Sequence, residues 1–114
     1  MPTRWYFLFP SLDAAARAVP PGTMRRLDAA GRKVCLVHHA HGFFALDDAC
    51  PHLGASLSEG HLNADGEVIC PWHSYRYDLR HGAECRQRSE PARLHRLERR
   101  DDGLYLGIEG LELV

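Results

Sequence analysis

Two short segments, each with one cysteine and one histidine, constrain this 114-residue chain more than any other feature. The first reads Cys50-Pro51-His52, and the second reads Cys70-Pro71-Trp72-His73, with 17 residues between His52 and Cys70. A proline follows the cysteine in both, which fixes the backbone and removes an amide donor. Two loops built alike can face each other across one metal centre that takes two thiolates and two imidazoles.

This donor set leaves two chemistries open. A zinc ion accepts two sulfur and two nitrogen ligands in a tetrahedral structural site, but the one-residue gap between Cys50 and His52 is shorter than zinc motifs favour. A binuclear iron–sulfur cluster is the alternative, in which two cysteines hold one iron and two histidines hold the other. Such a cluster is formally neutral when oxidised, whereas four thiolates would make it a dianion. An electron is therefore added more easily, and the reduction potential is higher.

Composition places the two segments in an ordinary globular chain. The length fits one domain, and we expect residues 1–114 to form it. A net charge of −1 gives no reason to expect binding to nucleic acid or to an anionic membrane. The apolar stretch Trp5–Phe9 is too short to span a membrane and lacks the pattern of a signal peptide, so we expect a cytoplasmic protein. The pairs Asp47-Asp48 and Asp101-Asp102 are typical of turns, and we predict no catalytic residues.

Short apolar segments separated by turn signals predict a mostly β fold with antiparallel strands. A short helix is expected over Ser11–Ala18, with Ser11 as its N-cap and Pro20-Pro21-Gly22 as its stop. Many short strands with regular turns are typical of a sandwich or a small barrel. The expected strands are Trp5–Phe9, Thr23–Asp28, Lys33–His38, Phe43–Leu46, Glu67–Cys70, Tyr75–Asp78, Leu94–Arg99 and Leu104–Ile108.

From about Phe43 to Gly82 the chain resembles the Rieske-type [2Fe–2S] family. The run Ala45-Leu46-Asp47-Asp48-Ala49-Cys50-Pro51-His52 is similar to the strand and turn that lead into the first ligand loop of that family. The run Cys70-Pro71-Trp72-His73, followed by Tyr77-Asp78-Leu79, is similar to the second. The resemblance implies layered antiparallel β-sheets with a small cluster-binding subdomain.

The resemblance also implies which residues bind the cluster. Cys50 and Cys70 would bind the inner iron, and His52 and His73 the outer, more exposed iron. The cluster-binding loops would lie near residues 48–58 and 70–78.

Several positions depart from other branches of the family. Membrane-complex Rieske proteins have one extra cysteine in each loop, joined as a disulfide; the matching positions here are Ala55 and Trp72, so this chain resembles the disulfide-free ferredoxin branch. Ser74 replaces the usual glycine, at a cost of about 1–2 kcal/mol if the backbone there needs a positive φ. Tyr75 replaces a serine donor of high-potential members, while Tyr77 keeps a tyrosine that we expect to hydrogen-bond the Cys50 sulfur.

The function implied is that of a one-electron carrier and not of an enzyme. The protein would take electrons from a flavin-dependent reductase and pass them to a terminal oxygenase or similar acceptor, working as a monomer. Two alternatives stay open: a small subunit of a reductase complex such as nitrite reductase, and a structural zinc-binding module.

The other cysteines and histidines receive simpler interpretations. Cys35 lies in an expected strand and is interpreted as a core residue, and Cys85 as a free thiol. His38, His39 and His41 are interpreted as exposed turn residues, with a second metal site as the alternative.

Charge is unevenly distributed along the chain. Residues 34–75 contain no Lys or Arg but five acids, namely Asp47, Asp48, Glu59, Asp65 and Glu67. Solvated turns and strand faces explain such a run most simply. The alternative is docking of this stretch onto a basic patch of a redox partner.

Overall fold

The computed structural model describes residues 2–29, 31–40 and 42–109. Within them, one short α-helix and one 3₁₀ turn accompany nine β-strands, so the predicted mostly β fold is confirmed. In chain order the elements are β1 (Thr3–Phe9), α1 (Leu12–Ala18), β2 (Thr23–Ala29), β3 (Arg32–His39), β4 (Gly42–Asp47), η1 (Leu57–Glu59), β5 (His61–Leu62), β6 (Glu67–Ile69), β7 (Arg76–Asp78), β8 (Leu94–Arg100) and β9 (Gly103–Glu109).

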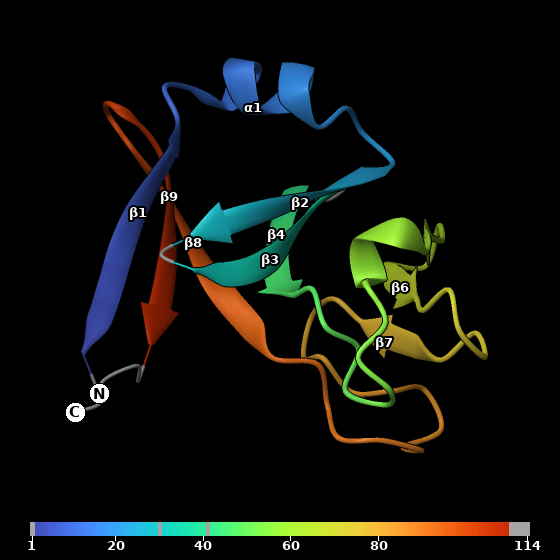
Figure 1. The fold of residues 1–114 in the computed structure, drawn as a ribbon. Helices are drawn as coiled ribbons and strands as arrows, with labels where there is room; N and C mark the ends of the chain where they lie inside the picture. Colours follow the sequence, from blue (N-terminus) through green and yellow to red (C-terminus); the bar gives the residue numbers. More distant parts are fainter. Residues whose placement is uncertain (1, 30, 41, 110–114) are drawn as a thin grey trace.

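The larger part of the molecule, which we call the base, is a six-stranded antiparallel sheet in the order β1-β9-β8-β4-β3-β2. Its halves are joined between β4 and β8 by two residue pairs, Ala45 with His95 and Leu46 with Leu94. Figure 1 shows α1 bridging the space between the end of β1 and the start of β2. Ser11 caps this helix as expected, since its side chain accepts a hydrogen bond from the amide of Ala14 at 3.0 Å.

The smaller part, which we call the tip, is the antiparallel sheet β5-β6-β7 with the loops around it. It is inserted between β4 and β8 and projects to one side of the base (Figure 1). Its strands have only two or three residues each. The sequence pattern missed β5 and η1, because neither has enough residues to show a period.

Strand β3 connects the cores of the two parts. Val34 and Leu36 point into the core of the base, while Cys35 and Val37 point into a second core shared with the tip. Successive side chains of a strand alternate between its faces, so a strand buried on both sides reads as a continuous apolar run. The interpretation of Cys35 as a core residue is confirmed, since its side chain is inaccessible to solvent.

The tip relies on one close backbone contact. A Cβ placed on Gly60, which follows η1, would lie 1.9 Å from the carbonyl oxygen of Ile69 in β6. Only glycine allows the chain to pass there. The described residues contain no helix of the length and apolarity that a membrane span requires.

Candidate metal centre

The two cysteine–histidine segments form matching loops at the tip. The amide of Cys50 donates to the carbonyl of Ala55 at 2.8 Å, and the amide of Cys70 donates to the carbonyl of Tyr75 at the same distance. Each cysteine amide thus bonds the carbonyl five residues further on. The first loop continues the chain after β4, and the second connects β6 to β7. Sequence predicted this likeness, and the structure confirms it.

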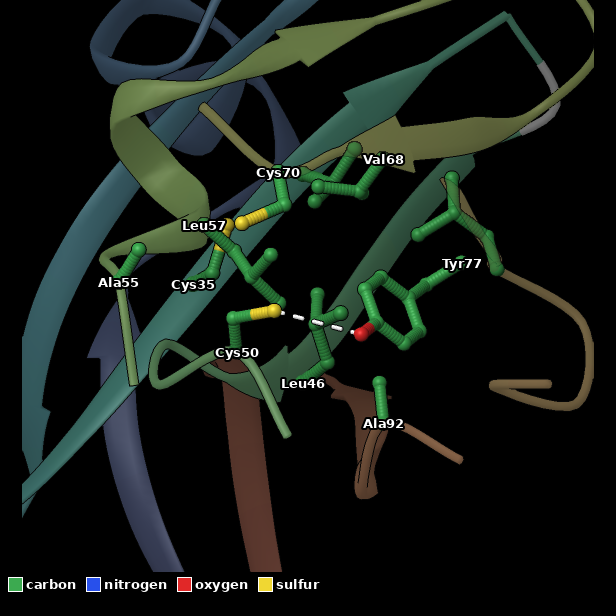
Figure 2. Packing of buried hydrophobic residues seen from close by; sticks show 11 residues of the cluster. Cys35, Leu46, Cys50, Ala55, Leu57, Val68, Cys70, Tyr77 and Ala92 are labelled. Carbon is green, nitrogen blue, oxygen red and sulfur yellow. Dashed lines mark hydrogen bonds between the residues drawn. The ribbon is translucent and has the colours of Figure 1, made fainter. Parts of the chain in front are cut away.

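Cys50 and Cys70 lie inside the shared core. Their exposed fractions are 3% and 2%, and both pack in the cluster that contains Leu57, Val68 and Tyr77 (Figure 2). Burial, together with the neighbouring Cys50 thiol, raises the pKa of Cys70 to about 11. Bound metal cations reverse this preference, because they favour the thiolate. The pair can therefore act as buried sulfur ligands.

The two histidines meet on the outer side of the loops. The rings of His52 and His73 lie edge to face, with centroids 5.5 Å apart. His73 is exposed, whereas His52 is half-buried. The Nδ1 atom of His52 is buried and has no hydrogen-bond partner among the described residues. An unpaired buried nitrogen is costly unless it binds something, and a metal ligand position accounts for it.

The four candidate ligands thus form one pair of cysteines and one pair of histidines. Cys50 adjoins Cys70, and His52 adjoins His73. In the described ranges no three His, Cys, Asp or Glu side chains are grouped closely enough to hold one ion. Two pairs of unlike ligands match a binuclear cluster with one thiolate-bound and one imidazole-bound iron.

Tyr77 makes the hydrogen bond expected of it. Its hydroxyl lies 3.2 Å from the Cys50 sulfur (Figure 2). The same hydroxyl lies 2.9 Å from the Ser89 hydroxyl. Burial and the contact with Cys50 raise the pKa of Tyr77, so the phenol keeps its proton. A protonated phenol can donate to a ligand sulfur.

The second loop contains local backbone strain. Ser74 has a φ of 59°, as its replacement of a family glycine led us to consider, and the preceding His73 has a φ of 64°. Each conformation costs about 1–2 kcal/mol in a residue with a side chain. The loop holds two such residues in succession.

The remaining cysteine positions follow expectation. All four cysteines are free, and Ala55 and Trp72 stand where a loop disulfide would need cysteines. Cys85 is exposed. Trp72 is 52% exposed.

The interpretation of the histidine group as exposed turn residues is wrong for His39 and His38. His39 is buried, with its Nε2 3.1 Å from the carbonyl of Ala64, because β3 extends one residue beyond its predicted end. His38 is half-buried and stacks on Phe43 at 4.0 Å. His41 lies outside the described residues.

Sequence reasoning also missed a buried carboxylate beside the site. Glu84 is 2% exposed and accepts hydrogen bonds from the backbone amides of Arg76, Arg86 and Arg88, and from the Arg88 guanidinium. These hydrogen bonds hold the pKa of Glu84 well below its usual range, chiefly through Arg88, although burial opposes the shift. In the sequence it stands as one of many acids, and no motif distinguishes it.

The five acids of residues 34–75 have different roles. Asp48 is buried and accepts from the Ser56 hydroxyl and the Ser58 amide. Asp47 binds Arg32 and His95. Glu67 lies 3.7 Å from Arg76, whereas Glu59 and Asp65 are exposed. The fold thus engages three of these acids in internal contacts.

Comparisons with known proteins agree with this geometry. The family model of the Rieske [2Fe-2S] domain matches residues 9–98. The ferredoxin subunit of 3-phenylpropionate/cinnamic acid dioxygenase from Photorhabdus laumondii is 33% identical over 91 residues, which cover 79% of this chain and 86% of that protein.

Two solved structures have similar folds. A chain in the complex of reduced oxygenase and oxidized ferredoxin in carbazole 1,9a-dioxygenase matches with a TM-score of 0.77 and 27% identity, over 95% of this chain and 97% of that one. A protein from Mycobacterium tuberculosis described as the small subunit of an NADH-dependent nitrite reductase matches with a TM-score of 0.80. That alignment covers 97% of this chain and 100% of the nitrite reductase subunit. At 15% identity, it shows a shared fold alone.

The family match spans well over half of the sequence, and the buried thiols and paired imidazoles suit the cofactor of that family. The chain therefore belongs to the Rieske [2Fe-2S] domain family, and it is an electron carrier with a Rieske-type [2Fe–2S] cluster and not an enzyme.

Proposed function

We propose that Cys50 and Cys70 bind the inner iron of the cluster and that His52 and His73 bind the outer iron. The observation that carries the proposal is the buried, unpaired Nδ1 of His52 beside the ring of His73. The chemistry of the donors supports it, since two buried thiols and two imidazoles are the Rieske ligand set. The ligand loops lie near residues 48–58 and 70–78, within one domain of residues 1–114.

In the proposed role the protein accepts one electron from a flavin-dependent reductase and passes it to a terminal oxygenase. The cluster, when bound, supplies the one-electron couple. Exposed His73 provides a point of contact for both partners, while the core around Cys50 and Cys70 excludes water. Support for an oxygenase as acceptor comes from the relative named as a dioxygenase ferredoxin subunit and from the solved oxygenase–ferredoxin complex.

Ligand substitution tests the assignment. We expect Cys50→Ser and His73→Gln to lose iron, acid-labile sulfide and the EPR signal of the reduced cluster. The matched controls are Cys85→Ser and His81→Gln, which change an exposed cysteine and an exposed histidine outside the two loops. Full cluster content in the ligand variants would contradict the assignment. Zinc in a folded, colourless wild-type protein would instead favour the structural zinc module.

The carrier is proposed to be a monomer that exchanges between partners. Sedimentation of the purified protein and reduction by a flavin-dependent reductase test this directly. A permanent complex with a reductase subunit would favour the alternative role as a fixed relay.

We propose the cytoplasm as its location. Its reducing conditions would keep all four cysteines as thiols or metal ligands, in agreement with their free state here. Cell fractionation with an antibody against the chain tests this location.

A further inference from the structure

Three side chains form a stack beside the metal centre. The ring of Tyr75 lies parallel to that of His52, with a centroid distance of 4.0 Å and an interplanar angle of 10°. The guanidinium of Arg88 lies 4.0 Å from the centroid of the Tyr75 ring. Since both contacts involve the Tyr75 ring, it links Arg88 to His52.

The outer end of the stack is anchored in the protein. Arg88 donates to the buried carboxylate of Glu84 through Nε at 3.1 Å and also through Nη2. Glu84 is held in turn by the backbone amides of Arg86 and Arg88 at 2.9 Å and that of Arg76 at 3.3 Å. A guanidinium bound in this bidentate way has a fixed plane, which suits it to packing against a ring.

The inner end of the stack is the ring of His52, whose buried Nδ1 is the nitrogen proposed to bind iron; no hydrogen bond to its other ring nitrogen, Nε2, is found among the described residues. Histidine ligands are ordinarily oriented by a hydrogen bond from the ring nitrogen that does not bind the metal. The ring contacts that the structure gives His52 are Tyr75 on one face and the edge contact with His73. Stacking can fix the plane of an imidazole as a hydrogen bond would, because rotation of the ring would break the parallel contact.

We propose that Tyr75 and Arg88 are positioning residues for His52. Together they hold its imidazole plane for iron binding, while anchoring by Glu84 fixes Arg88. This inference rests on the proposed role of His52 as a ligand. It also makes the two histidines inequivalent, because Tyr75 covers one face of His52 while His73 stays exposed.

The competing explanation is that Tyr75 is simply part of the core. Its side chain packs against the cluster shared by base and tip, and removing that bulk would loosen the tip without any special effect on His52. The test must therefore separate a flat aromatic ring from apolar bulk.

Substitutions of Tyr75 make that separation in the cluster-loaded protein. Tyr75→Phe keeps the ring and removes the hydroxyl, whereas Tyr75→Leu keeps apolar bulk and removes the ring. We expect Tyr75→Phe to retain the wild-type EPR g-values. Tyr75→Leu should shift and broaden them and should speed cluster loss to a chelator on the order of tenfold. Far-UV circular dichroism checks that both variants keep the fold.

Arg88 has a matched control two residues away. Arg88→Gln removes the guanidinium over Tyr75, while Arg86→Gln removes an exposed arginine for which no ring contact is found within residues 2–29, 31–40 and 42–109. We expect Arg88→Gln to shift the EPR spectrum in the same direction as Tyr75→Leu but less, and Arg86→Gln to leave it unchanged. Glu84 keeps its three backbone donors in both variants.

The outcomes separate this inference from the proposed function. Wild-type spectra and cluster-loss rates in a folded Tyr75→Leu protein would overturn the positioning role and leave His52 as a ligand. Equal EPR shifts in Arg88→Gln and Arg86→Gln would mean that Arg88 acts only through its charge, and would overturn its positioning role. A wild-type protein without a Rieske EPR signal would instead overturn the ligand assignment itself.

Discussion

The base and the tip of this molecule are stabilised in different ways. The base has strands of six to eight residues, whose alternating side chains fill an apolar core that includes Leu36 and Leu106. The tip has strands of two or three residues, and its buried groups include polar ones such as Asp48 and Glu84. It also contains the three described non-glycine residues with positive φ. A regular scaffold thus supports an irregular site, in which side chains bonded to the backbone replace long strand ladders.

The largest effect is expected in the base. Leu106→Ala deletes a side chain that is inaccessible to solvent, and large-to-small changes of this kind cost about 2–5 kcal/mol of unfolding free energy. Urea unfolding followed by far-UV circular dichroism measures the loss. Hydrogen exchange should speed up throughout the base, because its core is shared by all its strands. Faster exchange confined to the tip would contradict the separate stabilisation of base and tip.

A slightly smaller loss is expected in the tip. Glu84→Ala leaves the amides of Arg76, Arg86 and Arg88 without their acceptor, at a cost of about 2–4 kcal/mol. We expect faster hydrogen exchange around residues 76–88 with little change in β1 and β9. Glu84→Gln is the control, since it keeps the shape and one acceptor. An equal loss of protection in β9 would mean that base and tip unfold as one unit.

The junction between base and tip should depend on pH. Asp47 ends β4, and its carboxylate lies 3.1 Å from Arg32 and 2.7 Å from His95. Burial opposes ionisation, but the hydrogen bonds from His95 and Arg32 outweigh it and lower the pKa of Asp47 from 3.8 to about 2. A lowered pKa adds stability above the unfolded-state value, and that stability is lost as pH falls through the folded-state value.

Asp47→Asn should therefore cost about 1–2 kcal/mol at neutral pH. The difference from wild type should shrink as pH falls from about 4 to about 2, because the wild-type carboxylate is then protonated. Urea unfolding across this range measures it. The exposed control Asp65→Asn should show no such convergence, and a constant difference for Asp47→Asn would contradict the ion-pair explanation.

The smallest effect concerns the reduction potential. Tyr77→Phe removes the hydroxyl that contacts the Cys50 sulfur at 3.2 Å. If this hydrogen bond favours the reduced cluster by about 1 kcal/mol, the potential should fall by about 40 mV. Protein-film voltammetry measures the shift. Tyr105→Phe in the base is the control, and equal potentials in the wild type and Tyr77→Phe would remove this role.

Most of the base could be predicted from its sequence. The expected strand Lys33–His38 lies within β3. The expected helix is found as α1, which begins directly after its N-cap Ser11. Both follow from local signals, namely an apolar run and a capping residue. The predicted strand was one residue too short at each end. Pairing with β2 extends β3 to Arg32, and pairing with β4 extends it to His39.

The tip was predictable only where chemistry leaves a motif. The spacing of Cys50, His52, Cys70 and His73 indicated two facing loops, and a tyrosine four residues after the second histidine indicated the contact with Cys50. Element η1 and strand β5 were too short to give a periodic signal.

The sequence by itself therefore determined the candidate ligand residues, the kind of cofactor and the β class, because a ligand motif and strand alternation are local properties of the chain. Only the tertiary structure decided that Glu84 is buried, that Arg88 and Tyr75 stack beside His52, and that His73 is the more exposed of the two histidines. These features arise where the fold brings separate loops together. Residue spacing within one loop therefore does not predict them.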